Sequence, residues 1–346
     1  MGRRILWALL ALAPATVAVD KLASPDKVVL FLLAAASLIP LAWLIGESTE
    51  HAAEHTGPGI GGFLNASFGN APELIIALIA VAGNLPEVVR GSLAGSVVSN
   101  LLLVYGVTQI AGPDDEPIDR RSLFAQVALV GVAVLAFVVP VWLGYRGTPD
   151  RHTAVVASIP FAVVLLLVYL AVVGGNLRRH RASERAEPEI GAWPLAASLG
   201  VLAVATTATA FVSEVLVHSL DAFAHAVGLS QFFIAVVIVA IVGNAAEHGG
   251  AVVIARAGKM RLATEIAISS SAQVALLVAP AVMLLSLFFA HPLALAFRWI
   301  ELAAMAGSVL LVGAMVADGR SRRWEGMVLV AAYAAVVVAF FFAGDR

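Results

Sequence analysis

Cysteine is absent from the 346 residues of this chain, and charged residues make up only 13% of it. The lack of cysteine excludes disulfide bonds, thiolate metal sites and cysteine nucleophiles, and it says nothing about the cellular compartment. A soluble domain carries about 25% charged residues, so the chain falls outside the soluble range. With a net charge of −2, it has no general attraction for nucleic acid, which we exclude as a partner.

Hydrophobic residues dominate instead, at 61% of the chain and a mean hydropathy of +0.95. Apolar runs long enough to cross a bilayer recur from end to end, so the lipid bilayer is the expected environment. The sequence predicts an all-α polytopic membrane protein with about eleven transmembrane helices. The expected spans are 4–19, 27–45, 58–82, 91–111, 122–144, 152–176, 193–217, 231–256, 262–290, 293–316 and 324–343.

The first span allows a second interpretation. Arg3 and Arg4, followed by an apolar run and by Ala13-Pro14-Ala15, also fit a secretory signal peptide. Cleavage there would leave ten spans with unchanged orientation.

The distribution of Lys and Arg predicts the orientation. If the N-terminus is cytoplasmic and the spans alternate, 14 of these residues fall inside and 6 outside, with Arg298 inside a span. We therefore expect a cytoplasmic N-terminus and an external C-terminus, in a prokaryotic plasma membrane.

One short phrase occurs twice, as Gly69-Asn70-Ala71-Pro72-Glu73 and as Gly243-Asn244-Ala245-Ala246-Glu247. Aligning the two copies places Ser270 opposite Ser96 and Gln273 opposite Ser99. Five spans per half is an odd number, so the second half should enter the membrane inverted, as in many secondary transporters. The expected parts are an N-terminal helix at 1–26, a first five-helix repeat at 27–177, a cytoplasmic linker at 178–192 and a second repeat at 193–346.

The repeated carboxylates, Glu73 and Glu247, are costly features in an apolar chain. An acidic residue at the centre of a membrane helix costs about 2.5–3.5 kcal/mol on insertion scales, and such residues are functional by default. Each follows an asparagine by three residues, so Asn70 and Asn244 lie on the same helix face as their carboxylates. Pro72 favours a break that frees backbone carbonyls. An all-oxygen site of this kind suits Ca²⁺.

The same two carboxylates also bind protons. Because one site cannot hold a divalent cation and protons together, the pattern favours a cation/proton antiporter. A channel that used the carboxylates as a selectivity ring is the alternative mechanism.

Longer stretches around these motifs resemble the Ca²⁺/cation–proton exchangers of the cation/Ca²⁺ exchanger superfamily, over nearly the whole chain. The stretches are 39–42, 61–75, 91–104, 243–248 and 269–276. The resemblance implies a lone first helix, two five-helix repeats and proton-driven export of cytosolic Ca²⁺, with no cofactor. It implies that Glu73 and Glu247 are the central metal ligands, surrounded by Asn70, Asn244, Ser99 and Gln273.

Sodium-coupled exchangers of the same superfamily carry Thr-Ser where this chain has Asn70-Ala71. The loss of these hydroxyl groups favours the proton-coupled branch, and a sodium-coupled Ca²⁺ exchanger is the alternative. The cation could equally be Mn²⁺ or Cd²⁺, and the oligomeric state is open between monomer and homo-oligomer.

Other polar residues near the motifs are secondary candidates. Glu50 and Glu214 precede the motif helices and either couple protons and gate the site or are solvated at the interface. Spans two and seven, which carry them, are the expected moving pair. The glycines and proline that would form the first joint are Gly57, Pro58, Gly59, Gly61 and Gly62.

His248 follows Glu247 and either tunes it or packs between helices, and Ser96 and Ser270 are accessory to the site. An acidic stretch at 114–116, with Asp119, either gathers Ca²⁺ or is a solvated loop.

A rival hypothesis comes from His51-Ala-Ala-Glu54-His55, which matches the inverted zincin pattern. It predicts an intramembrane zinc protease. Five residues are a weak signal, no third ligand is evident, and the pattern gives the Glu247 half no role.

Overall fold

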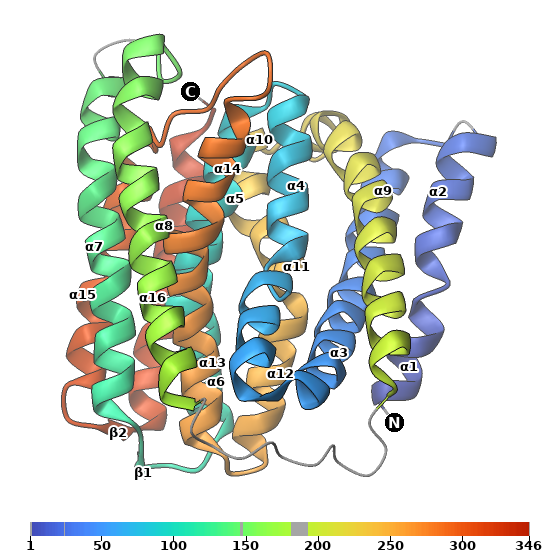
Figure 1. Cartoon of the computed structure of the whole chain (residues 1–346). Helices are drawn as coiled ribbons and strands as arrows, with labels where there is room; N and C mark the ends of the chain where they lie inside the picture. The colour runs from blue at the N-terminus through green and yellow to red at the C-terminus, as the bar shows by residue number, and fades with distance from the viewer. Residues whose placement is uncertain (1, 24, 146–147, 181–192, 346) are drawn as a thin grey trace.

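The computed structural model describes residues 2–23, 25–145, 148–180 and 193–345, and it is built almost entirely of helices (Figure 1). Within these residues, nine helices are long and apolar enough to cross a membrane, or ten if one bent pair counts as a span. The all-α membrane class is confirmed, while the count of eleven spans stays a prediction. The first-half elements are α1 (Gly2–Leu9), α2 (Leu12–Leu22), α3 (Lys27–Phe68), α4 (Ala71–Ala82), α5 (Pro86–Val98), η1 (Ser99–Val104), α6 (Tyr105–Ala111), α7 (Arg120–Tyr145) and α8 (His152–His180).

The second half follows the same plan with more subdivisions. Its elements are α9 (Leu195–Val227), α10 (Gln231–Phe233), η2 (Ile234–Val239), α11 (Ala240–Gly243), α12 (Ala245–Arg256), α13 (Met260–Gln273), η3 (Val274–Val278), α14 (Ala279–Ser286), α15 (Trp299–Val316) and α16 (Arg323–Ala343). The η elements are short π-helical segments within longer helices. Two short strands, β1 (Glu116–Pro117) and β2 (Arg320–Ser321), pair antiparallel between the loops that precede α7 and α16.

Three boundaries differ from the sequence expectation. α3 is one continuous helix of 42 residues where two spans were expected, and its last part turns back toward α4 (Figure 1). The whole Gly/Pro joint expected there belongs to a part of α3 whose side chains are not described, so its role as a joint stays a prediction. α9 continues ten residues beyond the expected end at 217, to a left-handed Gly228 that caps it. Residues 288–298 form a loop, so the expected tenth span begins later, at Trp299.

Both repeated motifs break a helix at the asparagine. Asn70 has φ −94° and ψ 14°, and Asn244 has φ −97° and ψ 6°, so the two breaks share one backbone conformation. The helices on either side of Asn244 meet at 56°. From these breaks α4 and α12 extend toward opposite ends of the molecule (Figure 1). The π-helical segments η1 and η3 also correspond closely. η1 starts at Ser99, and η3 starts at Val274, one residue after the position that aligns with Ser99.

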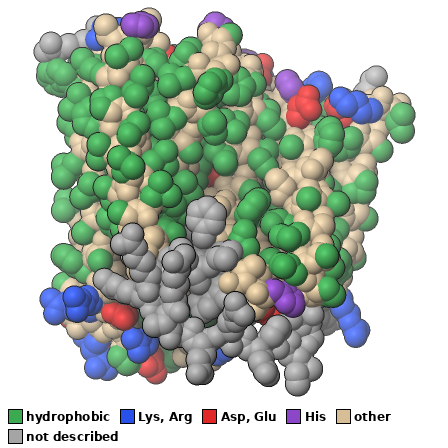
Figure 2. Space-filling model, in the orientation of Figure 1, with side chains coloured by type: hydrophobic (Ala, Val, Ile, Leu, Met, Phe, Trp, Pro, Cys, Tyr) green, Lys and Arg blue, Asp and Glu red, His purple; other side chains and the backbone are tan. Residues whose placement is uncertain are grey.

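The surface is that of a protein embedded in lipid. Hydrophobic side chains cover the middle of the visible face, while charged residues gather mostly at its two ends (Figure 2). Aromatic groups lie near both ends of the helices, with Trp142 packed against Trp299 at one end and Trp7 against Trp43 at the other. Such aromatic groups are typical of the two membrane–water interfaces.

Glycines let the core helices approach closely. A Cβ atom added to Gly95 of α5 would clash with the carbonyl oxygen of Val236 in η2. Gly91, one turn earlier, meets Phe232 and Ala235. This small-residue spacing is a common way for membrane helices to pack backbone against backbone. It fixes α5, which carries Ser96, directly against the helix that leads to the second motif.

We predict that Gly95→Ala destabilises the protein, since its methyl group would meet backbone that cannot move aside. Overpacking of this kind costs about 1–3 kcal/mol or more. The matched control is Gly307→Ala in α15, where an added Cβ meets nothing within 4 Å. Thermal unfolding in detergent should show a clear drop in Tm for Gly95→Ala only. An equal Tm for the two variants would contradict the close packing of α5 on η2.

Candidate functional site

The two motifs meet at the centre of the bundle, where each places its asparagine and glutamate beside the other half. Asn70 and Asn244 are each 1% exposed, and Glu73 is 7% exposed. Pro72 falls in the first turn of α4, where its missing N–H costs nothing, so the break and the new helix start agree with the sequence. The carboxylates stand in the first turns of α4 and α12, close to the positive ends of the helix dipoles.

Hydrogen bonds cross between the halves at both asparagines. Asn70 Nδ2 donates to Gln273 Oε1 at 2.5 Å, and Asn244 Nδ2 donates to Ser96 Oγ at 2.8 Å. Asn244 Nδ2 also donates to the carbonyl oxygen of Ala240 at 2.9 Å. Asn244 Oδ1 is buried and has no hydrogen-bond partner among the described residues.

The carboxylates are similarly placed. Glu73 packs on Gly243, where a Cβ atom would lie 3.6 Å from Glu73 Cγ, and it shares a small cavity with Ser96. Glu247 is close enough for its charge to act on Glu73, and it has Ser270 as a hydrogen-bonding neighbour. Glu73 Oε2 and Glu247 Oε2 are buried without a hydrogen-bond partner in the described part of the chain.

The chemistry of the centre follows from these orphaned oxygens. A buried polar atom without a partner costs about 1–3 kcal/mol. Three such acceptors converge here, and no Lys or Arg is among the residues that line the cavity beside Glu73. Carboxylate and amide oxygens are the ligands that hard cations prefer, and carboxylates also accept protons. The arrangement can therefore take up either a cation or protons.

Two further predicted residues lie at the edge of this centre. Ser99 is fully buried, and its hydroxyl group donates to the carbonyl oxygen of Ser96 at 3.3 Å. His248 Nε2 bonds to Asn100 Oδ1 at 2.8 Å, so the histidine joins α12 to η1. Asn100 is a site neighbour that the sequence analysis missed, since its aligned residue, Val274, is apolar and the repeat gave no signal.

Glu50 and Glu214 lie elsewhere. Both side chains are exposed, Glu50 on α3 and Glu214 on α9. Glu214 lines a shallow groove with Asp20, Lys21 and His218. Their role in proton coupling stays a prediction.

The zincin-like residues do not form a metal centre. His55 Nε2 bonds to the carbonyl oxygen of Trp193 at 2.6 Å, and the His51 ring stacks on Trp193 with centroids 4.6 Å apart. His51 lies between Glu47 at 3.5 Å and Glu54 at 3.8 Å. In the described ranges, no group of three or more His, Asp or Glu side chains is arranged to hold a metal ion.

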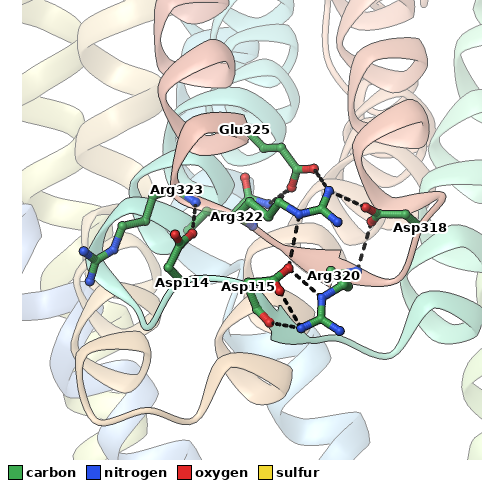
Figure 3. Close-up of polar contacts among 8 residues, drawn as sticks. Asp114, Asp115, Asp318, Arg320, Arg322, Arg323 and Glu325 are labelled. Atoms are coloured by element: carbon green, nitrogen blue, oxygen red, sulfur yellow. Dashed lines mark hydrogen bonds and ion pairs between the residues drawn. The ribbon is translucent and has the colours of Figure 1, made fainter.

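The acidic loop before α7 is neutralised by arginines (Figure 3). Arg320 donates to the two carboxylate oxygens of Asp115 at 2.5 and 2.7 Å, and Arg322 Nε adds a bond at 3.1 Å. We call this group, together with the β1–β2 pair, the β-clasp; its side chains are Asp115, Asp318, Arg320, Arg322 and Glu325. The hydrogen bonds and charge of Arg320 hold the pKa of Asp115 below its ordinary value.

Arg90 is a buried charge away from the centre that has fixed partners. Arg90, 1% exposed, donates to Asp150 Oδ1 at 2.8 Å and to Glu87 Oε1 at 2.9 Å. Arg298, for which the sequence suggested no chemistry, donates to the carbonyl oxygens of Gly344 and Ala343 at the end of α16. The bonds to Asp150, Gly344 and Ala343 join residues that are far apart in the sequence, so no local pattern indicated them.

Comparison with known proteins identifies the class. The sodium/calcium exchanger protein family matches residues 27–175 and 197–342. The chain is 37% identical to the Ca²⁺/H⁺ antiporter ChaA of Bacillus subtilis, over 98% of this chain and 99% of the relative. It is 34% identical to the Ca²⁺/H⁺ antiporter of Aphanothece halophytica, over 92% and 91%.

Solved structures agree. Native YfkE superposes with a TM-score of 0.83 at 35% identity, covering 97% of this chain and 99% of that one. The H⁺/Ca²⁺ exchanger CAX shares the fold, with a TM-score of 0.78 at 15% identity over 99% and 92%. The chain therefore belongs to the sodium/calcium exchanger family, in its cation/proton exchanger branch. It is an integral membrane transporter and not an enzyme, so the zinc protease hypothesis is set aside.

The β-clasp yields a pH prediction. The pKa of Asp115 is lower folded than its ordinary value of about 3.9, so its ion pairs stabilise the protein above that pH. This contribution is lost as the pH falls from about 4 through the lowered folded pKa. Asp115→Asn should therefore lower Tm by a few degrees at most at pH 7 and at pH 5, since the pair is exposed.

The control is Glu116→Gln, which removes the same charge from the neighbouring residue without touching these ion pairs. The difference between Asp115→Asn and the natural protein should shrink as the pH falls below about 4, and it should vanish once the pH is below the lowered folded pKa of Asp115. A difference in Tm that grew on acidification would show that the sign of this linkage is wrong.

Proposed function

We propose that this protein exchanges Ca²⁺ for protons by alternating access, with Glu73 and Glu247 as the central ligands. The observation that carries the proposal is the convergence of unpartnered acceptor oxygens from two oppositely directed broken helices. Asn70, Asn244, Gln273 and Ser99 surround the carboxylates, as ligands or as residues that orient them. The names of the Bacillus and Aphanothece relatives, both Ca²⁺/H⁺ antiporters, support the choice of ions.

The mechanism rests on competition at one site. Ca²⁺ needs both carboxylates deprotonated, because a protonated acid has lost the charge that holds the metal. Protons arriving at Glu73 and Glu247 therefore displace the cation, and the empty, doubly charged site is too costly in the bilayer to be carried across. Only the loaded forms cross, which couples the two fluxes in opposite directions. A channel lacks this coupling.

In this proposal the chain consists of an N-terminal helix, a first repeat at 27–177, a linker at 178–192 and a second repeat at 193–346. The two stretches matched by the family and the matching helix breaks support this division. Most of the linker, residues 181–192, lies outside the described residues. The β-clasp arginines lie at the same end as the N-terminus (Figure 1), which supports a cytoplasmic location for that end. Bacterial relatives favour the plasma membrane.

The first test removes one central charge at a time. Glu73→Gln and Glu247→Gln should each abolish Ca²⁺ uptake into inverted vesicles with an imposed pH gradient, since a neutral amide neither holds Ca²⁺ by charge nor takes up a proton. Ser99→Ala and Gln273→Ala are the comparison variants and should retain partial uptake. Undiminished uptake by either glutamate variant would refute the site assignment.

The same vesicles separate the proton-coupled from the sodium-coupled alternative. A sodium gradient at clamped pH should drive no Ca²⁺ uptake, because Asn70-Ala71 stands where sodium-coupled relatives present hydroxyl groups. Replacing Ca²⁺ by Mn²⁺ or Cd²⁺ in this assay measures the cation preference.

The second test concerns pH. Ca²⁺ binding to the purified protein should tighten as the pH rises from mildly acidic to neutral, because deprotonation of Glu73 and Glu247 precedes coordination. Isothermal titration calorimetry at several pH values, in buffers of different ionisation enthalpy, would also count the protons released. Affinity that did not change with pH, with no proton release, would rule out the competition mechanism.

A further inference from the structure

The two hydrogen bonds that cross between the halves are not equivalent. The 174-residue offset between the motifs relates polar residues pairwise: Asn70 and Asn244, Ser96 and Ser270, and Ser99 and Gln273. Asn244 donates to Ser96 Oγ, and strict symmetry would give Asn70 the equivalent partner, Ser270. The partner of Asn70 is instead Gln273, one helical turn further along α13.

The other two members of this set, Ser99 and Ser270, are not the partners of the asparagines in this state. Ser270 Oγ donates to the carbonyl oxygen of Ile266 at 3.0 Å, and Ser99 Oγ donates to that of Ser96 at 3.3 Å. Ser270 is also a hydrogen-bonding neighbour of Glu247. A hydroxyl oxygen that donates its proton in this way still has lone pairs to accept another bond. Each of these two serines lies three positions from the partner in use, about 5 Å along the helix.

Solvent exposure shows the same asymmetry independently. In the first turns of α4, Glu73 and Ile76 are buried, at 7% and 2% exposed. Their equivalents in α12, Glu247 and Gly250, are half-buried. The site is thus more open on the side toward which α12 extends, the end where the N-terminus lies (Figure 1).

We propose that the asparagines exchange partners during transport, so that Asn70 moves from Gln273 to Ser270 and Asn244 moves from Ser96 to Ser99. The exchanged set is the symmetry mate of the observed one, and it belongs to the state in which α4 is open and α12 is closed. Ser99 and Ser270 are then positioning residues for that opposite state.

The breaks make this movement feasible. Each asparagine is itself the residue at which the helix breaks, with non-helical φ and ψ. A change of bend there carries the amide along the partner helix without disturbing regular helix on either side. Because both shifts run in the same direction across the membrane, closing one side and opening the other become a single event. This partner exchange rests on the proposed function, the exchange of Ca²⁺ for protons.

The absence of cysteine from the natural chain makes the test direct. Single reporters are Ile76→Cys, buried in this state, and Gly250→Cys, where an added Cβ meets nothing within 4 Å. Each reporter is combined with one partner variant and labelled with a maleimide in nanodiscs, without Ca²⁺ and at fixed pH. Labelling after denaturation gives the total, which corrects for differences in yield.

Ser96→Ala and Gln273→Leu remove partners used in this state, so each should speed labelling of Ile76→Cys and slow that of Gly250→Cys. Ser99→Ala and Ser270→Ala remove partners of the opposite state and should do the reverse. Ser99→Ala is the cleaner of the two, because Ser270 also hydrogen-bonds to Glu247 in this state. The expected size is about fivefold, the factor that corresponds to one neutral hydrogen bond. The double variant Ser96→Ala/Ser99→Ala should return close to the starting rates.

The matched control is Ser308→Ala. Its hydroxyl group is buried on α15, is not among the residues lining the cavity beside Glu73, and donates to the carbonyl oxygen of Ala304 at 2.7 Å. It should leave both reporters unchanged. If Ser99→Ala and Ser270→Ala behave like this control, Gln273 reaches Asn70 simply because its side chain is longer, and the exchange is refuted. Shifts of all four variants in one direction would equally refute it.

These outcomes are separate from those of the transport assays. Maleimide labelling is measured without Ca²⁺, so it does not depend on transport. If the four single variants gave the expected labelling shifts but the protein failed to exchange Ca²⁺ for protons, only the proposed function would be overturned. Normal antiport without the pattern would overturn the partner exchange alone.

Discussion

A carboxylate in the middle of a bilayer is the constraint on which the rest of this structure depends. Its charge costs several kcal/mol unless something compensates it. The fold compensates Glu73 and Glu247 only in part: helix starts direct backbone dipoles at them, and asparagines supply further acceptors, while no arginine or lysine lines the cavity beside Glu73. What is missing is positive charge, which a mobile cation or protons can supply.

Other acidic residues of the chain do have a basic partner, which makes the lack of Lys and Arg in the cavity beside Glu73 informative. Arg90, as deeply buried as the site, is bonded to Asp150 and Glu87, and the β-clasp pairs its arginines with Asp115 and Asp318. The chain therefore has the means to neutralise an acid with a fixed base, and it uses them at both ends of the helices. Leaving the central acids without such a partner keeps their compensation exchangeable. A permanent ion pair would stabilise the fold and stop transport.

Much of this could be predicted from the sequence, because the informative features are local or repeated. Apolar runs give the membrane class, and the costly pair Glu73 and Glu247 gives the centre, since few other reasons exist for acids in such runs. Contacts between residues that are distant in the sequence could not be predicted. The partner of Asn70 depends on how α4 meets α13, and the bond between His248 and Asn100 has no counterpart in the other half.

Duplication with inversion explains why such a protein can have two states of similar energy. If the halves were identical, a structure open to one side would have a symmetry mate open to the other at the same free energy, and neither side would be favoured. Differences between aligned residues supply the bias. Where one half has Ser99 the other has Gln273, so Asn70 bonds to an amide oxygen, while the equivalent partner of Asn244 would be a hydroxyl group. A difference of about 1.4 kcal/mol would shift the two populations tenfold. Small departures from the repeat, more than the repeat itself, then determine which side of the membrane the empty carrier faces.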